Sequence, residues 1–200
     1  MINKLKSILD LIRFGNIIIA CITIFLASYM LSNTHSLSNC LLLVSFSMAF
    51  GNILNDLLDM NIDKIVHIKR PLITKAITDK EAKILLVICL IFIVLLCWDL
   101  NNVARFYFII MILPLLILYS LILKKVPFIS NIIIAFLLAF VFIFTELVTM
   151  GTHHQLIIPS LLAFGLSLLR ELIKDLSDYK GDKNNNINTV PVYFGINFAR

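Results

Sequence analysis

The chain alternates between long apolar runs and short polar segments. A helix needs about 20 mostly apolar residues to cross a lipid bilayer, and we predict six such spans. They cover residues 11–31, 37–58, 82–100, 103–123, 129–150 and 156–174. The expected fold class is therefore all-α, a polytopic transmembrane helix bundle, formed by a single membrane domain over residues 1–200.

Composition supports this prediction. Hydrophobic residues make up 60% of the chain, charged residues make up 14%, and the mean hydropathy is +0.98, well above the usual range for soluble domains. The formal net charge of +5 is not concentrated in a basic patch with interleaved aromatic residues, which is the pattern of nucleic-acid binding. We therefore expect membrane lipid, and no nucleic acid, as a partner.

The placement of basic residues predicts the orientation. Because successive spans change direction, the N-terminus, the 59–81 loop, the 124–128 turn and the tail after residue 174 share one side. All 17 Lys and Arg except Arg105 lie there, with Arg170 counted near the end of its span. Basic residues collect on the cytoplasmic side of membrane proteins, so we expect a multi-pass protein of the cell membrane with its N-terminus in the cytoplasm.

Two acidic clusters have the same spacing, D-x-x-D-x-x-x-D, and both lie at cytoplasmic ends of predicted spans. They are Asp56, Asp59 and Asp63, and Asp175, Asp178 and Asp182. On a continuous helix this spacing places three carboxylates on one face, where the helix dipole and mutual repulsion disfavour them. Two such faces predict a cationic ligand, and Mg²⁺ bound to a polyphosphate has the required chemistry.

A transporter or channel for divalent cations, with the clusters as a cytoplasmic acidic gate, is the alternative. Transport through the bilayer needs polar or acidic residues along the spans, and the predicted spans contain little charge in their interiors apart from Glu146. The pattern therefore favours a site at the membrane surface over a pathway through it.

Several segments resemble the UbiA-type intramembrane prenyltransferase family. They are N-D-L-L-D-M-N-I-D-K (55–64), K-R-P-L (69–72), R-E-L-I-K-D-L-S-D-Y-K-G-D-K (170–183) and T-V-P-V-Y-F-G (189–195). The resemblance extends to Arg13 and Asn16 in the first span and to Tyr119 and Lys124 at the end of the fourth. Among subfamilies, the second cluster is most similar to geranylgeranylglyceryl phosphate geranylgeranyltransferases.

The resemblance implies an enzyme, a Mg²⁺-dependent prenyltransferase. Such an enzyme transfers a prenyl group from an allylic prenyl diphosphate to a lipophilic or glycerol-phosphate acceptor within the membrane and releases diphosphate. It implies that all six aspartates are catalytic and bind the metal. The substrate-binding residues that it implies are Arg13, Asn16, Asn52, Asn55, Arg70, Tyr119, Lys124, Arg170 and Lys174.

The chain departs from the family pattern in two ways. In the loop after the first cluster, His67 stands where the family often has arginine and Lys75 where it often has glycine. Family members also have nine spans, whereas we predict six here. We therefore expect a prenyltransferase domain that is incomplete at its C-terminal end.

Overall fold

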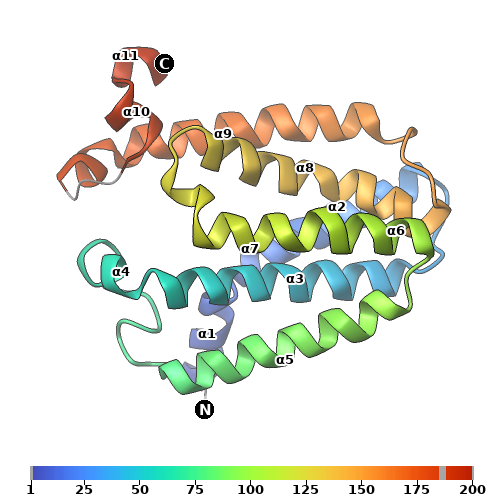
Figure 1. Ribbon diagram of the computed structural model, residues 1–200, viewed down its shortest axis with the longest axis horizontal. Helices are drawn as coiled ribbons and strands as arrows, with labels where there is room; N and C mark the ends of the chain where they lie inside the picture. The colour runs from blue at the N-terminus through green and yellow to red at the C-terminus, as the bar shows by residue number, and fades with distance from the viewer. Residues whose placement is uncertain (1, 185–187, 200) are drawn as a thin grey trace.

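The computed structural model describes residues 2–184 and 188–199. Helices that run side by side form this part of the chain (Figure 1). In chain order they are α1 (Ile2–Leu11), α2 (Phe14–Met30), α3 (Leu37–Leu58), α4 (Met60–Val66), α5 (Asp79–Trp98), α6 (Asn102–Tyr107), the π-helix η1 (Phe108–Ile112), α7 (Leu113–Leu121), the 3₁₀ turn η2 (Leu123–Lys125), α8 (Ile129–Met150), α9 (Ile157–Asn184), α10 (Val190–Tyr193) and α11 (Ile196–Ala199).

Four helical stretches in the described residues are long and apolar enough to cross a membrane. They are α3, α5, the α6–α7 stretch and α8, and α1 with α2 adds a fifth if that bent pair counts as one span. The predicted sixth span lies in α9, which is outside this group because charged residues fill its second half. The all-helical membrane fold is thus confirmed, with fewer qualifying spans than the six predicted.

The predicted first span is not one straight helix. The axes of α1 and α2 differ by 58°, and Arg13 between them adopts a left-handed backbone with φ 53°. The predicted fourth span is also irregular, because η1 interrupts it just before Pro114. Proline has no N–H to donate to the preceding turn, and a π-turn is one way for a helix to adjust.

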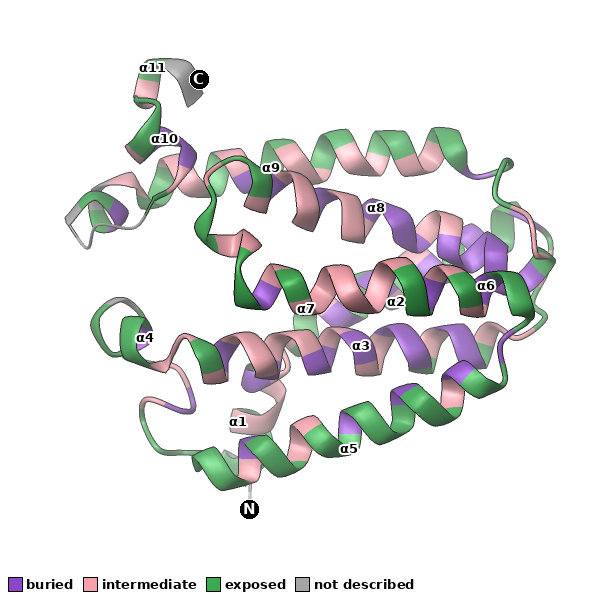
Figure 2. Ribbon diagram, in the orientation of Figure 1, coloured by how far each residue is buried: buried purple, intermediate pink, exposed green. Residues whose placement is uncertain are grey.

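Buried residues concentrate where α2, α3 and α8 meet, whereas much of α5 is exposed (Figure 2). The core includes Ile24, Leu43, Ile53, Phe144 and Leu147. Exposed apolar side chains on the outside of a membrane bundle face lipid tails, which are as apolar as they are. The C-terminal parts of α3, α7 and α9 lie with α4 at one end of the bundle, and both acidic clusters belong to this end (Figure 1).

Candidate active site

The first cluster lies on two helices, so the prediction of one continuous helical face is wrong for it. Helix α3 ends at Leu58, and Asp59 has φ −93° and ψ 4° before α4 begins at Met60. Asp56 is in the last turn of α3 and Asp63 is in α4. The three carboxylates, which we call the first triplet, therefore meet through a break in the helix.

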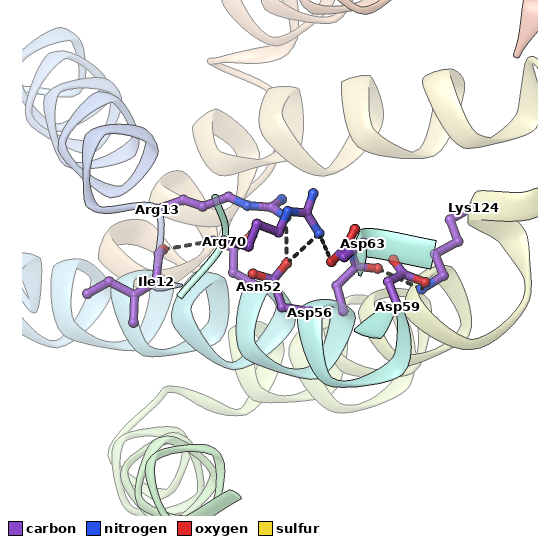
Figure 3. Close-up of polar contacts among 9 residues, drawn as sticks. Ile12, Arg13, Asn52, Asp56, Asp59, Asp63, Arg70 and Lys124 are labelled. Atoms are coloured by element: carbon purple, nitrogen blue, oxygen red, sulfur yellow. Dashed lines mark hydrogen bonds and ion pairs between the residues drawn. The ribbon is translucent and has the colours of Figure 1, made fainter. Parts of the chain in front are cut away.

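Two arginines bind the first triplet (Figure 3). Arg13 Nη2 donates to Asp56 Oδ1 at 2.9 Å. Arg70 Nη1 donates to the same oxygen at 3.1 Å and also to Asp63 Oδ2. The side chains of Asp56 and Asp63 are only 5% and 4% exposed, and buried carboxylates require such counter-charges to remain ionised at low cost.

Lys124 neutralises the remaining member of the first triplet. It comes from η2, after the predicted fourth span, and its Nζ donates to Asp59 Oδ1 at 2.6 Å and to Asn55 Oδ1 at 3.0 Å. The lysine thus joins the α7–α8 connection to the end of α3 (Figure 3). Four of the residues predicted to bind substrate therefore meet here. Arg13, Arg70 and Lys124 each bind an aspartate of the first triplet, and Asn55 binds Lys124.

Two more residues predicted to bind substrate, Asn16 and Asn52, lie at the bend between α1 and α2, close to Arg13. Asn52 Nδ2 donates to the Ile12 carbonyl oxygen at 2.9 Å, which satisfies a carbonyl group at the end of α1 that has no helical partner. Arg13 and Asn16 line an open hollow of about 530 Å³ at the bend, together with Asp10. Arg13 therefore connects this hollow to the first triplet.

The second triplet, Asp175, Asp178 and Asp182, lies on one continuous helix, α9, as predicted. Asp175 accepts a hydrogen bond at 2.9 Å from Asn131 Nδ2 on α8. Asp182 is buried and Asp178 is exposed. Within the described residues no ion pair joins these three carboxylates to a lysine or arginine, so the second triplet lacks the internal cations of the first.

Two residues are near enough to both triplets for charges to influence one another. Tyr119 on α7 is within electrostatic range of Asp59 and Asp175, and His67 is within range of Asp63 and Asp182. The two triplets therefore belong to the same end of the bundle. His67 stands where the family often has arginine. A positive charge at this position would favour the ionised form of Asp63 and of Asp182.

Two predicted residues are not drawn into this cluster. Arg170 is exposed on α9, and Lys174 Nζ binds Glu171 Oε2 at 3.4 Å instead of an aspartate. Sequence reasoning missed Asn131 and assigned Glu171 no role in the site, although Glu171 is only 7% exposed. The detectable signal for Asn131 was an amide in the first turn of a predominantly apolar helix.

Burial affects the acidity of the clusters. It raises the pKa of Asp63 above its ordinary value, although the Arg70 guanidinium acts in the opposite direction. Burial likewise raises the pKa of Asp175, against the Asn131 hydrogen bond, and the pKa of Asp182. Desolvation disfavours the ionised form of each carboxyl, so an added cation would stabilise the charged state of all three.

The donor set suits Mg²⁺. Among the described residues, no group of three or more His, Cys, Asp or Glu side chains is gathered closely enough to hold a metal ion without other ligands. Mg²⁺ usually takes only one or two protein carboxylates and completes its shell with water and substrate phosphates. Asp56 Oδ1 and Asp63 Oδ2 both contact a single cationic nitrogen, so two carboxylate oxygens, the number that Mg²⁺ usually takes from a protein, already face one positive point.

Comparison with known proteins agrees with this geometry. Residues 16–200 match the UbiA prenyltransferase family. The chain belongs to the UbiA prenyltransferase family. This confirms the family and the prenyltransferase class that the resemblance implied.

Individual relatives are similar over nearly the whole chain. The digeranylgeranylglyceryl phosphate synthase of Saccharolobus solfataricus is 33% identical over 200 residues, which cover 97% of this chain and 71% of the relative. The enzyme of the same name from Methanocaldococcus jannaschii is 34% identical over 202 residues, with 96% of this chain and 69% of the relative covered.

Solved structures show the same fold. A structure of digeranylgeranylglyceryl phosphate synthase in membranes superposes with a TM-score of 0.75 at 32% identity, covering 98% of this chain and 72% of that one. A UbiA homologue from Archaeoglobus fulgidus, bound to GPP and Mg²⁺, has a TM-score of 0.76 at 22% identity, with 96% and 71% covered. The helix arrangement of this UbiA-family chain is therefore that of an integral membrane enzyme.

Proposed function

We propose that this chain transfers a prenyl group from an allylic prenyl diphosphate to a hydroxyl of a glycerol-phosphate lipid, with Mg²⁺ and within the membrane. The observation that carries the proposal is the convergence of Asp56 and Asp63 on one cationic point beside Arg13 and Lys124. The Archaeoglobus homologue binds GPP and Mg²⁺, and the names of the relatives fit a glycerol-phosphate acceptor.

In the proposed reaction, the bond between the allylic carbon and the diphosphate oxygen breaks, and diphosphate leaves with the electron pair. The acceptor hydroxyl oxygen forms a new bond to the allylic carbon, and its proton passes to the released diphosphate or to solvent water. Mg²⁺, when bound, neutralises charge that develops on the diphosphate.

The aspartates of the first and second triplets would hold the metal. Arg13, Arg70 and Lys124 would bind diphosphate oxygens, the two arginines through paired hydrogen bonds from the guanidinium group and the lysine through its single ammonium group. Asn16, Asn52, Asn55, Tyr119, Arg170 and Lys174 would complete the substrate site. The apolar helices exclude water from the reacting allylic carbon.

We further propose that residues 1–200 act as one membrane domain with both triplets on the cytoplasmic side. The distribution of Lys and Arg supports this orientation. Trypsin should therefore cleave the exposed lysines of the 64–75 loop in inside-out vesicles and leave them intact in right-side-out vesicles. Cleavage from the other side would contradict the orientation.

The activity test uses purified protein in liposomes with a labelled prenyl diphosphate and a glycerol-phosphate lipid bearing a free hydroxyl. We expect Asp56→Asn to lower product formation about 100-fold or more, since even groups that only support metal ligands change affinity by about 10–100-fold. EDTA should abolish the reaction and added Mg²⁺ should restore it.

Asp99→Asn is the matched control, because Asp99 lies at the opposite end of the bundle, where it accepts a hydrogen bond from Asn39. It should leave the rate unchanged. Full product formation by Asp56→Asn, or in EDTA, would show that the proposal is wrong. Divalent-cation flux without transfer would instead support the transporter alternative.

A further inference from the structure

Arg70 occupies the point at which two carboxylates of the first triplet converge. One nitrogen, Nη1, donates to both Asp56 Oδ1 and Asp63 Oδ2 (Figure 3). The arginine side chain is itself only 24% exposed, so the contact is partly shielded from solvent. A single positive atom between two buried oxygens has the position and the sign of charge of a bound cation.

The rest of the first triplet is also neutralised internally. Arg13 binds Asp56 and Lys124 binds Asp59. Removing either partner of a buried pair is costly, because the remaining charge is left uncompensated. The first triplet therefore has a complete set of counter-charges from the chain itself, whereas in the second triplet Asp175 has a neutral donor, Asn131, in place of a cation.

We propose that Arg70 is an internal counter-ion that excludes a divalent cation from the first triplet until diphosphate is present. This inference rests on the proposed function. Arg70 has to release both oxygens before Mg²⁺ can be held between them, because Mg²⁺ requires oxygen ligands at about 2.0–2.1 Å. With diphosphate present, the released guanidinium gains phosphate oxygens as new partners.

The consequence is a positive coupling between metal and diphosphate. With metal alone, Arg70 loses two ion pairs and gains no new partner. With metal and diphosphate together, the lost pairs are replaced. Binding of either ligand should therefore strengthen binding of the other by the same factor, and Arg70 acts as a positioning residue that links the two events.

The test measures binding of Mn²⁺ alone, as a Mg²⁺ substitute, to the full chain in lipid nanodiscs, from the loss of the free-ion EPR signal. We expect Arg70→Gln to bind Mn²⁺ about tenfold more tightly than the unchanged protein, which is about 1.4 kcal/mol of binding free energy, because the ion no longer has to displace two charge-assisted hydrogen bonds. The same variant should bind inorganic diphosphate with Mn²⁺ less cooperatively.

Lys64→Gln is the matched control, because Lys64 is exposed, lies next to Asp63 in sequence and belongs to the same helix. It removes the same charge without vacating the point of convergence, so its Mn²⁺ affinity should change much less. Arg70→Lys keeps a cation within reach and should restore weak binding of Mn²⁺ alone. Size-exclusion profiles and thermal unfolding establish that each variant is folded.

Unchanged or weaker Mn²⁺ binding by folded Arg70→Gln would overturn the inference, as would an equal gain in Lys64→Gln. Either result leaves the proposed function intact if Asp56→Asn still abolishes prenyl transfer. Conversely, transfer by Asp56→Asn would refute the proposed function even if Arg70→Gln binds Mn²⁺ more tightly. If Arg70→Gln does not fold, the unchanged protein decides: Mn²⁺ binding that inorganic diphosphate does not strengthen overturns the inference.

Discussion

Glu146 gives the sharpest prediction about stability. It is completely buried near the end of α8 that lies away from the triplets. Its two carboxylate oxygens accept hydrogen bonds from Thr152 Oγ1 at 2.7 Å and from the backbone N–H groups of residues 154–156 at 2.9–3.1 Å. The acid therefore holds the α8–α9 loop and satisfies N–H groups at the beginning of α9.

Glu146→Gln keeps the shape of the side chain but replaces one acceptor oxygen with an NH₂ group. At least one buried N–H then loses its acceptor, which costs about 1–3 kcal/mol. The remaining hydrogen bonds also lose the contribution of the charge, which is about 1 kcal/mol for each such bond. We expect the free energy of unfolding to fall by about 2–4 kcal/mol, since the loop relaxes partly.

The assay is denaturant unfolding in mixed micelles, followed by far-ultraviolet circular dichroism. Glu81→Gln is the matched control: Glu81 also accepts a backbone N–H at a helix start, but it is much more exposed. Its loss of stability should be clearly smaller. Equal decreases in the free energy of unfolding of the two variants would show that the buried hydrogen bonds of Glu146 stabilise the protein no more than the exposed ones of Glu81.

Three further predictions concern the site and its loop. Lys124→Met should raise the KM for prenyl diphosphate about tenfold or more, because it removes a cation that we propose binds a diphosphate oxygen through a charge-assisted hydrogen bond, whereas Lys125→Met, an exposed neighbour, should not. Lys75→Gly should raise the free energy of unfolding by about 0.5–1 kcal/mol, because φ is 58° there and glycine adopts this region without strain; thermal unfolding measures it. Asn131→Ala should lower kcat/KM for transfer about tenfold, because Asp175 loses its hydrogen-bond donor. An unchanged kcat/KM would show that this hydrogen bond to Asp175 does not contribute to transfer.

Hydrophobic patterning located the straight helices well. The predicted spans 37–58 and 129–150 have the same limits as α3 and α8, because each run is mostly apolar over the length of a span. The bend at Arg13 was not predictable in this way, since neither proline nor glycine occupies that position. Its geometry depends on long-range contacts, from Asn52 to Ile12 and from Arg13 to Asp56, that a local pattern does not contain.

For the site, the sequence identified the residues but not the contacts between them. The repeated spacing identified both triplets and the resemblance identified Arg70 and Lys124. Neither predicted that these cations would bind the aspartates themselves, since that pairing joins Asp59 to Lys124 across 65 residues of sequence. The glycine expected at Lys75 has a physical explanation in the left-handed backbone of that position.

The break at Asp59 explains why the spacing of the aspartates did not predict how Asp56 and Asp63 are arranged. On a straight helix, residues seven apart are separated by about 10.5 Å along the axis, so one nitrogen could reach both carboxylates only by stretching between two turns. The interruption turns α4 away from the axis of α3 (Figure 1) and lets the loop that follows return Arg70 to both side chains. The helix break and the Arg70 bridge are therefore one feature, because the break makes room for a cation between Asp56 and Asp63 and Arg70 is the cation that fills it.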